Sequence, residues 1–191
     1  KCAWPLCGAG CENSPLHVEE CKLMSSRNFR AKIDYNTSEP QKKESAYCVI
    51  LPLRCILLKA KSQANYEQFM NLESHLEQRQ ETPLYKILRA NLVTFVQTIL
   101  NLQQWSADDI LGISARLDTN CFDVRQTVGG RKARAIYGAA AMISHDCVSN
   151  VRHTFDDKMN IIFLAKIKIA KGDIISTSYT QVSVRTYLKN F

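Results

Sequence analysis

Apolar residues recur at helical spacing through the middle of the chain. The stretch 66–79 repeats Phe69, Leu72 and Leu76, and a longer stretch opens at Thr82-Pro83. The longer stretch carries one broad apolar face, made of Leu84, Ile87, Leu88, Leu92, Phe95, Val96, Ile99 and Leu100. Such periodicity predicts amphipathic helices whose apolar residues form a core. Ser106-x-x-Asp109 has the spacing of a capping box, with aspartate in place of the usual glutamate, and predicts a further helix.

The pattern changes after residue 134 to short apolar runs separated by polar loops. An apolar run from Ala135 leads to the polar loop 144–150, and a second run, 160–170, leads to the turn 171–173. The last of these segments ends on Tyr179. Short apolar runs bounded by turn residues are typical of strands. The sequence therefore predicts an α+β protein.

The first 25 residues are rich in soft metal ligands. These are Cys2, Cys7, Cys11, His17 and Cys21. The pairs Cys7/Cys11 and His17/Cys21 have i, i+4 spacing, which a short helix places on one face. Zinc prefers four thiolate or imidazole ligands, and a short segment with few large apolar residues gains its folding free energy from the metal. Loosely spaced free cysteines are the alternative, and the clustering disfavours it.

Composition narrows the class of protein. The 191 residues, 46% of them hydrophobic, suffice for one core and a small appendage. The sequence contains no run of 18 apolar residues, so it predicts no membrane span, and the first residues lack the apolar stretch of a signal peptide. The net charge of +7 is spread along the chain, without the Lys/Arg stripe of a DNA-binding helix. The cysteine cluster indicates metal in a reducing compartment, so an intracellular protein of the nucleus or cytoplasm is expected.

Several motifs together resemble one known family. They are the Ser144-His145-x-Cys147-x-x-Asn150 loop, the Lys171-Gly172-Asp173 turn, the Ser178-Tyr179 pair, the segment Leu72-Glu73-Ser74-His75, Asp118-Thr119-Asn120-x-Phe122 and the cysteine cluster. Their order resembles the SET domain of protein-lysine methyltransferases, most closely the SMYD (SET and MYND) family and its arthropod branch. The resemblance implies a truncated SET domain, with small twisted β-sheets, a threaded loop, a helical insertion and a partial MYND zinc finger.

The resemblance also implies domain boundaries and ligand sets. The expected parts are 1–25, the C-terminal part of the finger; 26–45, a linker; 46–128, the helical insertion; 129–180, the C-terminal SET core; and 181–191, the start of a post-SET helix expected at 183–188. In the family template Cys7 and Cys11 share one zinc ion, and Cys2, His17 and Cys21 share another, with the remaining ligands upstream. Cys147 matches a ligand of a further zinc site. The chain is thus expected to be a fragment that does not catalyse alone.

The family's functional residues map onto named positions. Tyr179 matches the catalytic tyrosine, which orients the lysine amine. Taken alone, such a residue is more typical of a core tyrosine with a satisfied hydroxyl, and the surrounding motifs favour the site. The positions implied to contact S-adenosylmethionine are Asn120, Ser144, Glu73 and His75, together with His145, whose family counterpart contacts the cofactor largely through its backbone. The residues alone make the segments 72–75 and 118–122 equally consistent with capping or surface elements. A protein lysine, histone or non-histone, is the implied substrate, and the MYND finger implies docking of proline-rich partners. Contact with nucleic acid or membrane is not expected.

The chain departs from the family motif at three positions. Ser144 stands where the family has an asparagine that holds the cofactor's amino-acid end, Asp146 where it has serine, and Ser149 where it has proline. Asp146 could attract the cofactor's positive charges or spoil the pocket. Two hypotheses follow: a fragment of an S-adenosylmethionine-dependent protein-lysine methyltransferase, or a catalytically inactive SET scaffold that acts as an interaction or transcriptional adaptor. A basic DNA-binding helical protein ranks below both.

Overall fold

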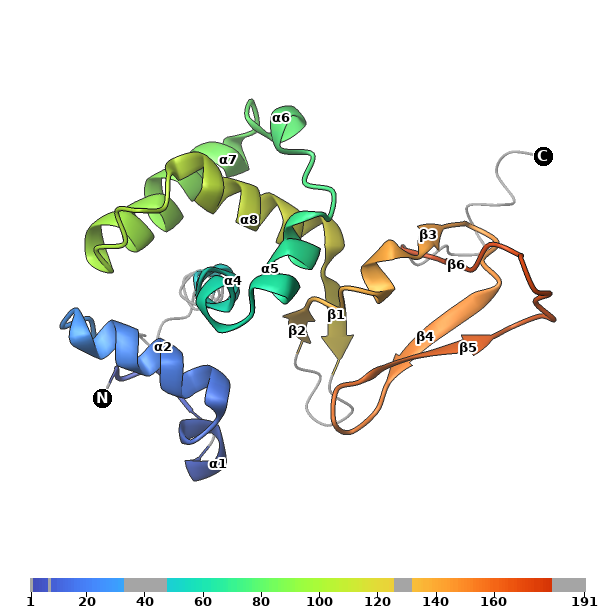
Figure 1. Ribbon diagram of the computed structural model, residues 1–191, viewed down its shortest axis with the longest axis horizontal. Coiled ribbons are helices and arrows are strands. Elements are labelled where there is room, and N and C mark those ends of the chain that lie inside the picture. Colours follow the sequence, from blue (N-terminus) through green and yellow to red (C-terminus); the bar gives the residue numbers. More distant parts are fainter. Residues whose placement is uncertain (1, 7, 33–47, 126–131, 180–191) are drawn as a thin grey trace, which may run out of the picture. The chain divides into compact units, whose positions relative to one another are not determined.

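The computed structural model describes residues 2–6, 8–32, 48–125 and 132–179. The chain divides into two compact units, Lys1–Thr119 and Asn120–Phe191 (Figure 1). The first unit is helical and the second is built mainly of short strands. Helices together with small sheets confirm the predicted α+β class. The helix expected at 183–188, the linker beyond residue 32 and Cys7 lie outside the described residues.

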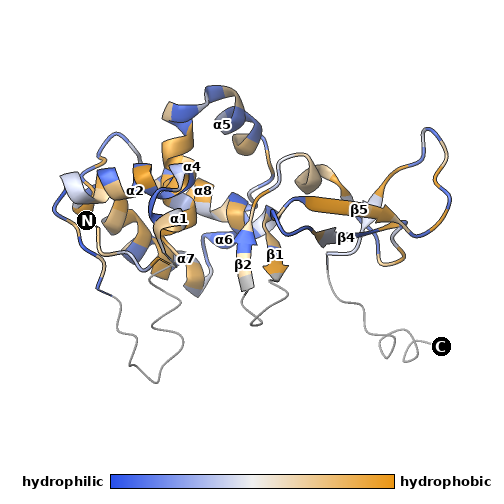
Figure 2. Cartoon of the chain, turned by 90° about the horizontal axis from the view of Figure 1, so that it is seen from below, coloured by the Kyte–Doolittle hydropathy of each residue, from blue (hydrophilic) through white to orange (hydrophobic). Residues whose placement is uncertain are grey.

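Helices packed around an apolar core make up the first unit. They are α1 (Ala9–Glu12), α2 (Pro15–Ser26), α4 (Ile50–Lys61), α5 (Gln63–Met70), α6 (Leu76–Arg79), α7 (Pro83–Leu88), the π-helical segments η1 (Arg89–Val93) and η2 (Phe95–Ile99), and α8 (Ala107–Asn120). Met24, Leu53, Val96, Ile110 and Ile113 are completely buried. Each helix carries both hydrophobic and hydrophilic residues (Figure 2). The core therefore forms where the apolar faces of several helices meet.

Two helix starts confirm the predictions from local sequence. The Thr82 hydroxyl accepts a hydrogen bond from the backbone N–H of Tyr85 at 3.3 Å, and Pro83 occupies the first position of α7. Ser106 and Asp109 form a reciprocal capping box before α8. The Ser106 hydroxyl accepts from the Asp109 N–H at 3.1 Å, and the Asp109 carboxylate accepts from the Ser106 N–H at 3.2 Å. Aspartate thus serves as well as glutamate at this position.

The predicted periodic stretches differ from the structure in two places. The stretch 66–79 is interrupted by a turn between α5 and α6. The predicted face of the next helix is only partly buried: Leu84, Ile87 and Ile99 are 50%, 56% and 44% exposed. The π turns of η1 and η2 replace the 3.6-residue period and shift the phase between α7 and the residues that follow it, so Leu92 and Val96 are buried while Leu84 and Ile87 lie off the buried face.

A buried ion pair joins α2 and α4. The Glu20 side chain is 2% exposed and accepts a hydrogen bond from the guanidinium Nε of Arg54, whose side chain is 37% exposed. A buried carboxylate without its partner keeps the cost of desolvation. We expect Arg54→Met to lower the free energy of unfolding by about 2–3 kcal/mol, below the range for fully buried pairs because Arg54 is partly solvated. Urea denaturation measures this, and Glu20→Leu with Arg54→Met should restore most of the loss; a double variant as unstable as the single one would contradict the explanation.

The described part of the second unit contains three two-stranded sheets. Strand β1 (Phe122–Arg125) pairs antiparallel with β2 (Lys132–Ala135), and β4 (Val151–Phe155) pairs antiparallel with β5 (Ile161–Ala165). Strand β3 (Ser144–His145) pairs in parallel with β6 (Ser176–Thr177), and a short 3-10 turn, η3 (Ala140–Met142), precedes β3. The β5 ribbon is hydrophobic along its length (Figure 2). The β3–β6 pair places the 144–150 loop beside the segment that ends at Tyr179.

Aromatic rings form a cluster in the second unit, around His153 of β4. The ring centroids of Phe122, Phe155 and Phe163 lie 5.5, 5.7 and 6.1 Å from that of His153, and Tyr137 stacks edge-on against Phe122. Apolar rings on several sides withdraw the imidazole from water. Burial lowers the pKa of His153 below its ordinary value of 6.5.

This pKa shift predicts a loss of stability in acid. The unfolded chain takes up the His153 proton near pH 6.5, whereas the folded chain takes it up at lower pH. The neutral His153 therefore contributes fully to the free energy of unfolding above pH 6.5, and this contribution is lost as the pH falls below that value. We expect thermal denaturation between pH 7.5 and 5 to show a smaller decline for His153→Phe, which keeps an aromatic ring, than for the natural protein. Identical declines would assign the acid sensitivity to other groups.

Candidate functional site

The loop 144–150 is fastened at both ends to the segment leading to Tyr179. At its start, Ser144 and His145 pair with Ser176 and Thr177 in the parallel β3–β6 ladder. At its end, the Asn150 side-chain amide donates to the carbonyl of Ile174 and its oxygen accepts from the N–H of Ser176, both at 2.8 Å. Two segments about 30 residues apart in sequence are thereby held together. The loop is a rigid support for the residues that follow β6.

Tyr179 lies against this support and faces outward. Its side chain is 61% exposed, so the alternative of a buried core tyrosine is wrong. The hydroxyl donates a hydrogen bond to the carbonyl of Ile143, and the backbone N–H donates to Nδ1 of His145 at 3.0 Å. The tyrosine and imidazole ring centroids are 5.1 Å apart. The carbonyl of Ile143 was not predictable as a partner, because a backbone acceptor leaves no mark in the sequence.

The positions that depart from the motif have clear local roles. The Asp146 carboxylate accepts from the N–H of Val148 at 2.7 Å, an Asx-type bond that shapes the loop. Ser149 is buried; its hydroxyl donates to the carbonyl of Val151 and lies 2.9 Å from the Lys166 ammonium. Ser144 is exposed. Asp146 and Ser149 thus stabilise the loop, whereas the effect of Ser144 on cofactor binding stays a prediction.

Cys147 lies at the exposed tip of the same loop. Its sulfur is 3.5 Å from Nε2 of His145. Among the described residues of this unit no group of three metal ligands gathers around it. The proposed zinc role of Cys147 therefore still depends on the family resemblance.

The segment 73–75 forms a compact turn in the first unit. The Glu73 carboxylate accepts from the N–H groups of Ser74 and His75 at 2.8 and 3.0 Å, and these bonds hold the pKa of Glu73 below its ordinary value. His75 has a left-handed backbone, with φ of 49°, immediately before α6. The Thr119 hydroxyl lies 3.3 Å from the carbonyl of Ser74. Glu73 therefore stabilises the turn before α6, which is the capping role that the sequence left open beside a binding role.

A cleft of about 530 Å³ opens beside this turn. It is lined by Met70, Glu73, Ser74, His75, Leu76, Glu77, Gln78, Asp108, Asp109, Gly112 and Arg116. Its size lies within the range of small-molecule sites. Four carboxylates against one guanidinium give it an acidic lining. Asn120, also predicted to contact the cofactor, is the last residue of α8 and is half-buried.

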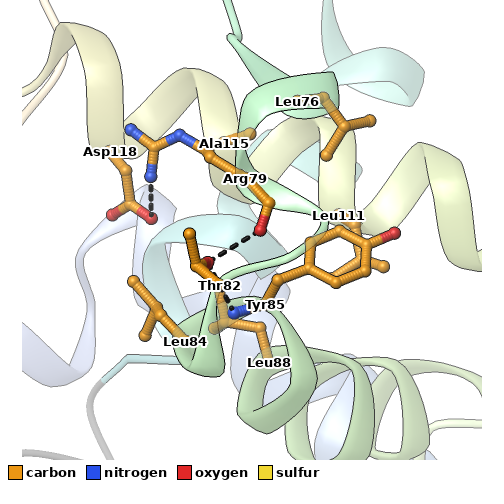
Figure 3. A pocket seen from close by; sticks show the side chains of 9 residues that line it. All are labelled: Leu76, Arg79, Thr82, Leu84, Tyr85, Leu88, Leu111, Ala115 and Asp118. Atoms are coloured by element: carbon orange, nitrogen blue, oxygen red, sulfur yellow. Dashed lines mark hydrogen bonds and ion pairs between the residues drawn. The ribbon is translucent and has the colours of Figure 1, made fainter.

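A second, much smaller hollow of about 10 Å³ lies between α6, α7 and α8 (Figure 3). Arg79 spans it, with Nη1 3.4 Å from the Asp118 carboxylate and Nη2 3.3 Å from the Thr119 hydroxyl. The Thr82 hydroxyl donates to the carbonyl of Arg79 at 2.7 Å. Such a volume holds about one water molecule. This hollow is a packing feature.

Three of the predicted metal ligands come together in the first unit. The ligand atoms of Cys2, His17 and Cys21 all lie within 4.8 Å of one another, and the Cys2 sulfur is 3.7 Å from Nε2 of His17. Tetrahedral zinc places sulfur and nitrogen ligands about 3.6 Å apart. Helix α2 positions His17 and Cys21 one turn apart, and Cys2 and His17 are buried. Cys11 is exposed and outside this cluster.

The two thiols of the cluster differ in acidity. Burial raises the pKa of Cys2. Burial also acts to raise the pKa of Cys21, but hydrogen bonds from the Cys2 backbone, the Cys2 thiol and Ser25 outweigh it and lower that pKa. The deprotonated form that a metal requires is therefore easier to reach at Cys21 than at Cys2.

Comparison with known proteins identifies relatives of the chain. The family model of the SET domain matches residues 18–180. Two isoforms of the Drosophila melanogaster SET domain-containing protein SmydA-8 are similar: isoform A is 22% identical over 187 residues and isoform B 25% identical over 183. Both alignments cover 95% of this chain and 37% of the relative, so the chain spans little more than a third of their length. Among the described residues, no helix combines the length and apolar character needed to cross a membrane.

Proposed function

The chain belongs to the SET-domain family, and we propose that its full-length protein transfers methyl groups from S-adenosylmethionine to a lysine amine of another protein. The observation that carries the proposal is the fixed, outward-facing Tyr179. Its hydroxyl donates to the Ile143 carbonyl, and its backbone is bonded to the loop that carries the family motif. The SET-domain relatives support the same class of reaction.

Methyl transfer requires no covalent bond between the protein and the reactants. When bound, S-adenosylmethionine supplies a methyl group on a positively charged sulfur, which keeps the bonding electrons as the methyl leaves. The lysine must arrive as a neutral amine, although its ordinary pKa is about 10.4, so its proton is lost before the nitrogen attacks the methyl carbon. The Tyr179 hydroxyl gives its hydrogen to the Ile143 carbonyl, so its oxygen keeps lone pairs that accept an amine N–H. That bond turns the nitrogen lone pair toward the methyl group.

The residues present are suited to the cofactor. Its sulfonium, ammonium and carboxylate give it a net charge of about +1, and the cleft beside Glu73 has an acidic lining and sufficient volume. We propose that Glu73 and His75 contact it in this cleft. The family resemblance further implies contacts from Asn120, from Ser144 and from the backbone of His145. Ser144 offers a shorter reach than the family asparagine, so affinity is expected to be reduced.

Cys2, His17 and Cys21 fit a structural zinc ion. The distance of 3.7 Å between the Cys2 sulfur and Nε2 of His17 suits a tetrahedral site, the three ligand atoms lie within 4.8 Å of one another, and Cys2 and His17 are buried. We propose that zinc at this cluster fixes α2 against the N-terminal segment, and that Cys7, Cys11 and Cys147 serve other zinc sites. We further propose that the finger region binds proline-rich partner proteins and that the protein resides in the nucleus or cytoplasm.

Calorimetric titration of S-adenosylmethionine into the zinc-loaded full-length protein tests the function. The natural protein should bind, and Ser144→Asn should bind about tenfold more tightly, because an amide reaches further than a hydroxyl and adds about one hydrogen bond. Methyl transfer to a mixture of protein substrates should accompany binding. Binding by neither protein would rule out the methyltransferase.

An inactive SET scaffold is the second candidate, and Ser144 is the observation that favours it. If the pocket has lost its ability to bind the cofactor, the natural protein should not bind S-adenosylmethionine and the Ser144→Asn variant should bind it. In that case the protein would act through partner binding, as an adaptor, and Tyr179 would have no reaction to serve.

A further inference from the structure

We propose that the imidazole of His145 is a positioning residue for Tyr179. This inference rests on the proposed methyl transfer, and it assigns a specific task to a side chain in that reaction. The carrying observation is the bond of 3.0 Å from the backbone N–H of Tyr179 to Nδ1 of His145.

Both ring nitrogens of His145 face groups of the chain itself. Nδ1 accepts the Tyr179 N–H, which requires that this nitrogen carry no proton. The proton of the neutral ring then lies on Nε2, which is 3.5 Å from the sulfur of Cys147. Nδ1 is thereby committed to the Tyr179 backbone, and the positioning role belongs to this nitrogen.

Tyr179 is held at both ends by one short segment. The His145 ring fixes its backbone, and the carbonyl of Ile143, two residues earlier, receives its hydroxyl. The β3–β6 ladder pairs His145 with Thr177 and fixes the same segment just before the tyrosine. Because Tyr179 is 61% exposed, core packing does not determine its direction. The direction of the hydroxyl then depends on these hydrogen bonds.

Two substitutions separate the role of Nδ1 from that of the whole ring. In His145→Asn the amide oxygen, bonded to Cγ, occupies the place of Nδ1 and still accepts the Tyr179 N–H. In His145→Gln the amide is one carbon further out and corresponds to Nε2, so the acceptor is lost. The residues are otherwise alike in charge and polarity.

The full-length protein should respond differently to the two changes. We expect His145→Gln to lower kcat by about 10- to 100-fold, with the Kd for S-adenosylmethionine and the melting temperature unchanged, because misplacement of a reacting group acts on rate. His145→Asn should keep kcat within about threefold. A raised Kd in both variants would make the imidazole a cofactor ligand, and an equal loss of kcat in both would show that Nδ1 is not what matters; either result overturns the inference.

Hydrogen exchange at the Tyr179 amide tests the contact without any assay of activity. Exchange should be about fivefold faster in His145→Gln than in the natural protein, and close to natural in His145→Asn. Unchanged exchange in His145→Gln would overturn the inference even in an active enzyme. Altered exchange in a protein that binds no cofactor would instead show that the contact is real and that the proposed function has failed, and with it the role in reaction.

Discussion

Replacing Tyr179 by phenylalanine in the full-length protein should lower kcat for methyl transfer by about 100- to 1,000-fold. The change removes the oxygen that aligns the amine, while the ring and the backbone bond to His145 remain. Binding of S-adenosylmethionine should stay within about twofold of the natural value, since the hydroxyl serves the amine. Steady-state kinetics and calorimetry on the same preparation measure the two quantities.

Tyr137→Phe is the matched control. The Tyr137 hydroxyl also donates to a backbone carbonyl, that of Met159 at 2.5 Å, so the same atom and the same type of bond are lost in the same unit. Each variant should lose about 1 kcal/mol of stability, and only Tyr179→Phe should lose activity. Full activity of Tyr179→Phe would remove the hydroxyl from the mechanism.

Loss of the metal cluster should produce the largest loss of stability. A structural zinc ion contributes about 10–16 kcal/mol of apparent binding free energy, and Cys21 and His17 bring two ligands from one helix. We expect Cys21→Ser in the full-length protein to lower the melting temperature by about 10 °C or more. Metal analysis should show one zinc ion fewer per molecule.

Cys48→Ser provides the comparison, because Cys48 is exposed and lies outside the cluster. It should leave both the zinc content and the melting temperature unchanged. Prolonged chelation of the natural protein should reproduce the Cys21→Ser melting temperature. A Cys21→Ser protein with its full zinc content and natural stability would show that the three ligand atoms lie together without holding a metal.

The predicted residues of the candidate site came partly from local spacing and partly from the family resemblance. The i, i+4 spacing of His17 and Cys21 is a helical pattern, and both residues do lie on one helix, α2. The loop motif led to Ser144, His145 and Tyr179, which the second unit brings together. The bond between His145 and Tyr179 joins residues 34 apart, and no local pattern encodes it.

The helix starts were predictable from the sequence, whereas the burial of some helical residues was not. The capping box at Ser106 and the Thr82 cap depend on side chains three residues from their partners, so sequence spacing was sufficient. The burial of Leu84, Ile87 and Ile99 was predicted wrongly, because a fixed 3.6-residue period does not allow for π turns. The role of Asp146 was left open, since its bond to the Val148 N–H depends on the shape of the loop.

The π-helical segments have a consequence for how the chain tolerates changes in length. A π turn accommodates more residues than an α turn over the same rise, so η1 and η2 hold surplus chain between α7 and the residues that follow. Removing one residue from Arg89–Ile99 can be absorbed by a return to α geometry, with both flanks kept in place. The same deletion in α4 or α8 would rotate every later side chain by about 100°. Single-residue gaps between this chain and its relatives are therefore expected to gather at 89–99, and insertions there to have been retained during evolution.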